Sequence, residues 1–352
     1  MRNSALLAVR RSVWCAVSCA ALSAAVPGAS AASPPPREAP RVPFAARHQA
    51  VQHGGIVRAA NTSTQGTEGT ESVNDGAGIG YVDVDSDPHT YNSSRAALAV
   101  PEGARVTWAR LYWGGNLRVG EQKPPKDDGR VLIAEPGGRY KALLADSVIG
   151  HRTADGADAF QASADVTDLV RRSGPGQWTV AQVNVATGRS AVGGWGGWTL
   201  VAAYEKASEP LRRISVWDGF ETVGPRAGEV RVPLDGNRFP KGVSGRLGLI
   251  AYDGDRGTSG DYLTVETSRS KSTRLSDSAN SADDVLNSTI TEFGTRGTVR
   301  LPDRTNTLGY DSDVFDLRGA LRSGGDRVHV RVGSRKDTVW LGAVFLQADV
   351  RR

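Results

Sequence analysis

Short runs of alternating apolar and polar residues recur from Ile79 to the end of the chain, about every ten residues, with Gly, Asp, Asn and Pro between them. A period of two indicates antiparallel strands with one buried face. Helix signals are few and short: residues 165–172, which Asp165 could cap, and 281–287, which begin at a serine. The pattern predicts an all-β protein with two tandem antiparallel β-sandwich domains of jelly-roll type, at 79–206 and 207–352.

The order of these runs repeats along the chain. Asp165–Leu169 (DVTDL) is similar to Asp313–Leu317 (DVFDL), and two strand-like runs follow each. We therefore expect that one sandwich is duplicated, that Asp165 and Asp313 both cap a helical turn, and that the second copy has an insertion at 278–307. Antiparallel β domains in general share such patterns, which is the alternative explanation. The other matched segments are 105–113 with 246–252, 131–146 with 262–277, 177–185 with 326–332, and 198–204 with 339–346.

The first 78 residues lack this alternation. Arginines precede an apolar run at 13–26, and small residues at 29–31 offer a cleavage site, so residues 1–31 are predicted to be a signal peptide. The apolar run is shorter than the ~20 residues that span a bilayer, and we expect no membrane span in the mature chain. Residues 32–78 are polar and rich in Pro, Gly and Thr, which predicts a disordered arm.

Cysteine content and net charge limit the classes of function that the sequence supports. Both cysteines, Cys15 and Cys19, lie in the predicted leader, so the mature chain would have no thiol and no disulfide. The formal net charge is +5, and removal of the three leader arginines leaves +2. Lysines and arginines form no dense stripe, so nucleic-acid binding is not expected.

Candidates for catalysis are few. No Gly-x-Ser-x-Gly elbow occurs, and the five histidines show no metal-ligand spacing. Two carboxylates could hydrolyse a glycoside, but their separation decides this and the sequence does not give it. We therefore expect no enzymatic activity, with a carbohydrate-active hydrolase as the alternative. The carboxylates in or beside predicted strands are Glu135, Glu205, Asp218, Glu221 and Glu266.

Closely spaced aspartates offer hard oxygen ligands suited to calcium. The preferred candidate site is Asp253, Asp255 and Asp261, on both sides of a Gly-Thr-Ser-Gly turn. Two further candidates are the aspartates within 83–87 and those within 311–316. None forms a complete calcium loop, and aspartates at strand ends are also ordinary turn and cap residues.

Trp195 is the candidate for ligand binding. It lies in the glycine-rich segment 191–197, with few other large side chains beside it. An exposed ring on such a loop could stack on a sugar or on a partner side chain. Alternatively, the ring folds back over the sandwich edge.

Four segments resemble the region shared by secreted actinobacterial proteins of the DUF3344 type, which also stands at the front of some large bacterial surface proteins of adhesin character. The resemblance implies a non-catalytic extracellular module that binds a glycan or protein ligand or has a structural role, with no active residues to carry over. We expect release into the medium or loose association with the cell envelope. The four segments are 108–115, 197–205, 214–220 and 306–316.

Overall fold

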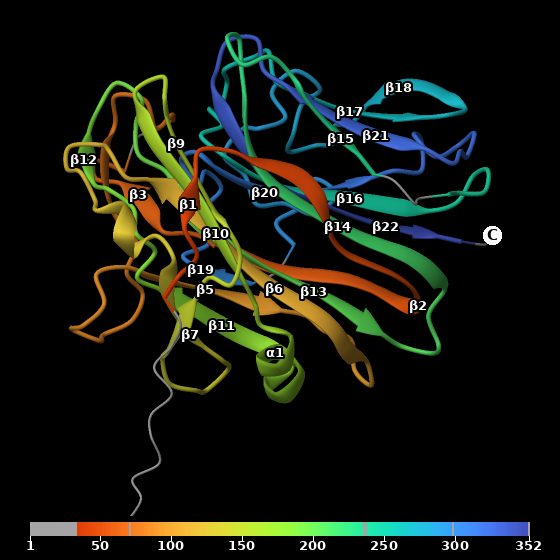
Figure 1. Cartoon of the computed structure of the whole chain (residues 1–352), viewed down its shortest axis with the longest axis horizontal. Coiled ribbons are helices and arrows are strands. Elements are labelled where there is room, and N and C mark those ends of the chain that lie inside the picture. Colours follow the sequence, from red (N-terminus) through yellow and green to blue (C-terminus); the bar gives the residue numbers. More distant parts are fainter. Residues whose placement is uncertain (1–33, 70–71, 235–237, 298, 351–352) are drawn as a thin grey trace, which may run out of the picture. The chain divides into compact units, whose positions relative to one another are not determined.

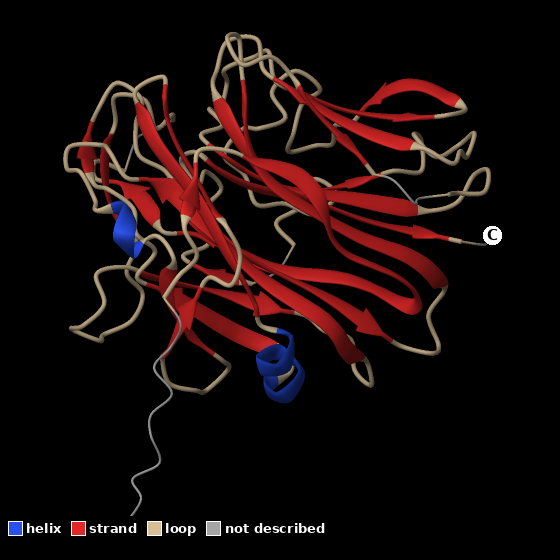
Figure 2. Cartoon of the chain, in the orientation of Figure 1, coloured by secondary structure: helices blue, strands red, loops and turns tan. Residues whose placement is uncertain are grey.

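Strands make up nearly all of the regular structure in the computed structural model, which describes residues 34–69, 72–234, 238–297 and 299–350 (Figure 1, Figure 2). The prediction of an all-β sandwich protein is confirmed. The predicted signal peptide lies outside the described residues. From Pro34 onward the chain forms one compact unit, and no helix in the described ranges is long and apolar enough to cross a membrane.

The elements, in chain order, are β1 Glu38–Ala39, β2 Val42–Thr62, β3 Thr64–Gly66, β4 Gly78–Tyr81, β5 Ser93–Leu98, β6 Arg105–Asn116, η1 Pro125–Asp127, β7 Arg130–Ala134, β8 Lys141–Leu144, β9 Ile149–Ala154, β10 Ala157–Asp165, α1 Thr167–Ser173, β11 Gly176–Ala181, β12 Gly188–Arg189, β13 Gly196–Glu205, β14 Leu211–Val223, β15 Val230–Pro233, β16 Gly245–Tyr252, β17 Tyr262–Thr267, β18 Ser270–Arg274, β19 Arg300–Leu301, β20 Tyr310–Asp316, β21 Val328–Gly333 and β22 Val339–Asp349.

Ten strands form one ladder in the order β1-β9-β10-β6-β13-β2-β14-β22-β16-β20. An outer sheet, β19-β5-β11-β7-β8, packs on the half that contains β6 and β13 and encloses a first hydrophobic core. A second outer sheet, β15-β21-β17-β18, packs on the half that contains β16 and β22 and encloses a second core. A third core lies between the two halves of the ladder.

Alternate side chains of the ladder strands enter different cores. In β6, Leu111 and Trp113 lie in the first core, whereas Tyr112 lies in the third. In β16, Leu249 lies in the second core and Ile250 in the third. Because both faces of these strands are covered, their sequences are apolar on both sides.

The longest strand, β2, belongs to both halves of the ladder. Residues 42–53 pair with β14 and residues 54–62 pair with β13, so the strand passes from one half to the other at Gly54 (Figure 1). Within the described part of 32–78, this corrects the prediction of a disordered arm, which rested on the polar, Pro-, Gly- and Thr-rich composition. The backbone of residues 42–53 forms hydrogen bonds with β14, and His48 stacks on Trp108 with 4.9 Å between ring centroids.

The same strand order occurs twice. The ladder reads β10-β6-β13-β2 in one half and β20-β16-β22-β14 in the other, and the outer sheets read β5-β11-β7-β8 and β15-β21-β17-β18. The expected division at residue 206 falls between β13 and β14. However, β2 serves both halves, and β19, from the second half of the sequence, pairs with β5. The two sandwiches are therefore not independent along the chain.

The sequence match between the two Asp-Val-x-Asp-Leu segments is three residues out of register. Asp165 ends β10 opposite Arg110, and Asp316 ends β20 opposite Arg246, so Asp316 is the equivalent of Asp165. Each accepts a backbone hydrogen bond two residues on, at 2.8 Å from Thr167 and 2.6 Å from Arg318. The predicted cap role of Asp313 is wrong, since this residue is buried within β20.

One of the two predicted helices forms. α1 covers Thr167–Ser173, which overlaps the predicted span of 165–172 and ends one residue beyond it, and it buries Val170 (Figure 2). Residues 281–287 form turns instead of a helix, although the serine and aspartate spacing resembled a capping box. In these turns the Ser281 hydroxyl donates to Asp283, and the Asp284 carboxylate accepts a hydrogen bond from the backbone of Gly257.

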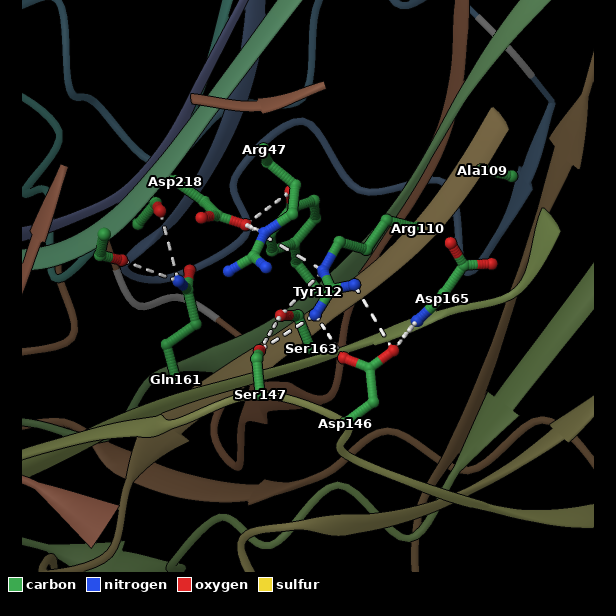
Figure 3. A network of polar contacts seen from close by, with 12 residues as sticks. Arg47, Ala109, Arg110, Tyr112, Asp146, Ser147, Gln161, Ser163, Asp165 and Asp218 are labelled. Atoms are coloured by element: carbon green, nitrogen blue, oxygen red, sulfur yellow. Dashed lines mark hydrogen bonds and ion pairs between the residues drawn. The ribbon is translucent and has the colours of Figure 1, made fainter. Parts of the chain in front are cut away.

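A buried polar network joins the two halves of the ladder (Figure 3). Asp218 on β14 accepts hydrogen bonds from Arg47 Nε at 2.7 Å and from the Tyr112 hydroxyl at 3.0 Å. Gln161 on β10 donates to the carbonyl oxygens of Gly219 and Gly342, at 2.9 and 3.1 Å. Because unmet polar groups in an interior are costly, these bonds favour one alignment of the two halves.

We predict that Gly54→Ala destabilises the whole protein by more than about 3 kcal/mol. Gly54 has φ +132°, and a Cβ there would collide with the carbonyl oxygen of Tyr204. The matched control is Gly103→Ala, where φ is +71° but the space is open; it should cost about 1–2 kcal/mol for the backbone conformation alone. Denaturant unfolding measures both, and equal losses would contradict the role of Gly54.

Candidate cation site

A group of aspartates lies where β16 ends and β20 and β22 begin, since Tyr252 pairs with both Tyr310 and Trp340. These aspartates come from several loops and from β20. Each of these aspartates lies within electrostatic range of at least one other member of the group. Repulsion between the two carboxylates raises the pKa of one of them. This acidic loop cluster consists of Asp75, Asp253, Asp255, Asp261, Asp284, Asp311 and Asp337.

Burial is the main cause of the raised pKa values in the cluster, and repulsion between neighbouring carboxylates adds to it. The pKa of Asp255 rises to about 6 and that of Asp261 to about 7. Burial raises the pKa values of Asp253 and Asp311 well above the usual range for aspartate. Near neutral pH the cluster therefore either keeps protons or bears costly negative charge.

Some carboxylate oxygens of the cluster have hydrogen-bond donors. Asn74 Nδ2 donates to Asp253 at 2.7 Å, the backbone of Thr289 to Asp311 at 3.0 Å, and the backbone of Gly257 to Asp284 at 2.9 Å. Several other oxygens in and beside the cluster are buried and accept no hydrogen bond: Asn74 Oδ1, Asp255 Oδ1, both oxygens of Asp261, Asp284 Oδ1, Asp311 Oδ2 and Asp337 Oδ2.

Asp261 is the most isolated member, with a relative exposure of 0%. The nearby Ser334 hydroxyl partly offsets the rise in its pKa, but no donor reaches either carboxylate oxygen in hydrogen-bond geometry. Within the described ranges, no three His, Cys, Asp or Glu side chains are arranged to hold one metal ion. An ion here would therefore need amide, carbonyl or water oxygens as well as carboxylates.

The structure places Asp253 and Asp261 each within electrostatic range of Asp255, and it adds Asp311 from the third candidate segment. Asp284, Asp337 and the segment around Asn74 were missed, because they lie in distant loops and no local spacing links them to Asp253. The candidate at 83–87 forms a turn: Asp85 accepts a backbone hydrogen bond from Asp87 at 2.8 Å, and Asp87 accepts one from His89 at 3.0 Å. The hydroxyls of Ser93 and Tyr140 also donate to aspartates of this turn. Those aspartates therefore act as turn-forming residues, the alternative to a calcium site.

Strand β20 differs from its counterpart β10 in having two buried aspartates. By the register with β6 and β16, Asp311 and Asp313 occupy the positions of Phe160 and Ala162 on β10. Phe160 and Ala162 belong to the first hydrophobic core, whereas both aspartates have a relative exposure of 0%. The fold thus accepts apolar side chains at these positions, so the aspartates are not required by the strand order itself.

The family model described as "Protein of unknown function (DUF3344)" matches residues 43–289, more than half of the chain. This chain belongs to the DUF3344 family. The match begins within β2, so the strand shared by both halves is part of the family region.

Comparison of this DUF3344 protein with curated proteins gives no significant match. Among solved structures, the major capsid protein P2 of bacteriophage PM2 matches at 11% identity and a TM-score of 0.21, over 76% of this chain and 96% of that one. A Sulfolobus turreted icosahedral virus structure matches at 8% and 0.21, over 88% and 91%. Quercetin 2,3-dioxygenase from Acinetobacter baumannii matches at 9% and 0.22, over 85% and 87%. TM-scores this low establish neither a common fold nor a common activity.

Trp195 of the DUF3344 chain is not an exposed contact residue, which corrects the sequence interpretation. Its relative exposure is 0%, and its ring lies in the third core, 5.1 Å from that of Trp340 and 5.8 Å from that of Tyr252, centroid to centroid. The glycines of its loop allow neighbouring backbone to approach, as at Gly193, where a Cβ would collide with Asn74. The ring therefore closes the core beside the acidic loop cluster.

We predict that Trp195→Ala lowers the free energy of unfolding by about 3–5 kcal/mol, as expected for loss of a fully buried aromatic side chain. Phe293→Ala serves as a surface control, because Phe293 is 41% exposed; its cost should be about 1 kcal/mol or less. Equal, small losses in thermal or denaturant unfolding would restore the interpretation of Trp195 as a ligand contact.

The strand carboxylates considered for hydrolysis all have cationic partners. Arg105 contacts Glu205 at 2.8 Å, Arg331 contacts Glu266 at 3.0 Å, and Arg47 contacts Asp218 at 2.7 Å. Glu135 pairs with Lys141, and Glu221 with Arg41. Glu205 ends a strand of the ladder, whereas Glu266 lies in an outer sheet of the other sandwich.

Proposed function

We propose that this DUF3344 protein is a non-catalytic module that acts outside the cell, where it binds a glycan or protein or has a structural role in the envelope. The predicted leader supports export, and the paired sandwiches with a shared strand support a rigid framework for loops.

One observation carries the non-catalytic part of the proposal: Asp255 and Asp261, the cluster carboxylates whose pKa values rise to about 6 and about 7, are buried away from the surface cavities. Asp255 and Asp261 have relative exposures of 5% and 0%. Cavities of about 500 and 400 Å³ exist elsewhere and contain no member of the acidic loop cluster. A general acid or base must come within hydrogen-bond reach of its substrate.

The cavity of about 400 Å³ supports a binding role instead. Arg213, Arg238 and Arg269 line it together with Phe239. In the described ranges, none of these arginines forms an ion pair with a carboxylate, although Asp326 also lines the cavity and lies within electrostatic range of Arg269. Three guanidinium groups beside an apolar ring suit a ligand with carboxylate or sulfate groups, such as an acidic glycan.

We predict no turnover in a screen of chromogenic glycosides, and binding to acidic members of a glycan array. Glu205→Gln and Glu266→Gln should change neither result and should cost less than about 1 kcal/mol of stability, because their ion pairs are partly solvated. Arg269→Ala should weaken glycan binding, with Arg172→Ala, an exposed arginine on α1, as the matched control. Glycoside turnover that is lost in Glu205→Gln or Glu266→Gln would overturn the proposal in favour of a hydrolase.

A further inference from the structure

We propose that the acidic loop cluster binds calcium, and that Asp261, Asp255 and Asn74 supply side-chain oxygens to the ion. The inference goes beyond the proposed function and does not depend on it, since a cation can stabilise the loops of a binding module or of an enzyme.

The first argument is the number of oxygen atoms without a donor. Both carboxylate oxygens of Asp261, together with one oxygen each of Asp255 and Asn74, are buried and accept no hydrogen bond. Asp261 and Asn74 have a relative exposure of 0%, so bulk water does not solvate them. Native interiors rarely leave so many acceptors unmet in one place, and a bound cation would satisfy them together.

The second argument is the absence of an internal counter-charge. None of the ion pairs in the described ranges includes Asp253, Asp255, Asp261, Asp284 or Asp337. The strand carboxylates, by contrast, have arginine or lysine partners. Lys336 lies in one of the cluster loops, yet its ammonium group donates to Ser259 at 3.1 Å. Within the described ranges, Arg256 lies within electrostatic range of Asp284 and lowers its pKa, but it forms no ion pair with the cluster. The remaining charge must be balanced by bound protons or by a cation.

The ligand chemistry selects the ion. All unmet groups are carboxylate or amide oxygens, and the cluster loops contain no histidine or cysteine, which disfavours zinc. Because no three carboxylates among the described residues surround one point, the coordination shell needs amide, backbone or water oxygens. Calcium accepts six to eight such ligands in flexible geometry, whereas magnesium requires near-octahedral geometry and gives up its water reluctantly.

Several chain segments approach one another closely at the cluster. A Cβ at Gly254 would collide with the carbonyl oxygen of Leu286 and with Asp311 Oδ2, so glycine lets three chain segments meet there. Asn74 adds a fourth segment, from the β3–β4 loop of the first sandwich, through its 2.7 Å hydrogen bond to Asp253. An ion at this place would therefore tie loops of both sandwiches together.

The test uses the full exported chain, stripped with a chelator and then freed of it. Titration of calcium chloride in a calorimeter should show binding with a dissociation constant of ~10⁻⁴–10⁻³ M, the range of extracellular calcium modules, and calcium should raise the unfolding midpoint. Absence of both effects at ~10 mM calcium would overturn the proposal. So would magnesium binding of equal or higher affinity.

Asp261→Asn keeps the shape of the side chain and removes the charge. We expect affinity for calcium to fall by about tenfold or more, as for loss of a charged ligand. In chelator, the same variant should unfold at or above the midpoint of the unchanged chain, because repulsion has been relieved. Asp255→Asn should have the same effects. It serves as the test variant if Asp261→Asn does not fold.

The matched control is Asp303→Asn, which removes an exposed carboxylate outside the cluster, in the segment 278–307, paired with Arg296 at 3.1 Å. It should bind calcium within about twofold of the unchanged chain, the spread expected for a surface charge outside the site. Calcium affinity that is the same in Asp261→Asn, Asp255→Asn and Asp303→Asn would place the ion elsewhere and contradict the assignment.

Discussion

The backbone ladder through β2 is the interaction on which the rest of the structure depends. One strand bonds to β14 along its first part and to β13 along its second, with the change at Gly54. Each half of the ladder then presents one face to an outer sheet and the other face to its counterpart. Without β2, each half of the ladder would end in an unpaired edge strand. No continuous strand would then hold the two halves in register around the third core.

The repeated strand order gives the protein a framework, and the acidic loop cluster is a place where the second copy departs from the first. Asp311 stands where the first copy has Phe160, so charge has replaced core at a position that the fold can fill with an apolar side chain. Burying carboxylates without partners costs stability. Such a cost points to a requirement beyond folding. The loops that contain these carboxylates meet beside Trp195, which closes the third core.

Much of the fold could be predicted because strand alternation and Gly/Asp turns are local signals. The repeat could be recognised for the same reason, although the Asp-Val-x-Asp-Leu match was three residues out of register: short motifs recur by chance, and only ladder pairing fixes the equivalence of Asp165 and Asp316. β2 was missed because half of it is polar and half-exposed, so its strand character comes from β14 and β13 rather than from its own sequence. Trp195 was misjudged because glycine neighbours suggested an open loop, whereas they allow close packing around the ring.

The candidate site was predictable only where its members are close in sequence. Asp253, Asp255 and Asp261 share one loop, but Asp284, Asp337 and Asn74 reach the cluster through the topology of the second sandwich and the β3–β4 loop. Local spacing does not encode such convergence, and it does not reveal which oxygens lack a donor. The structure supplies both facts.

The central claim is that a strand shared by both halves makes the two sandwiches one cooperative unit. Native-state hydrogen exchange of the amides in β6, β13, β16 and β22 tests it most directly, since all four strands lie in the ladder on the two sides of β2. The account predicts that the slowest amides of both halves open with the same free energy, equal to that of global unfolding. Protection that is lost in one half at a clearly lower free energy than in the other would show two independent domains and contradict the account.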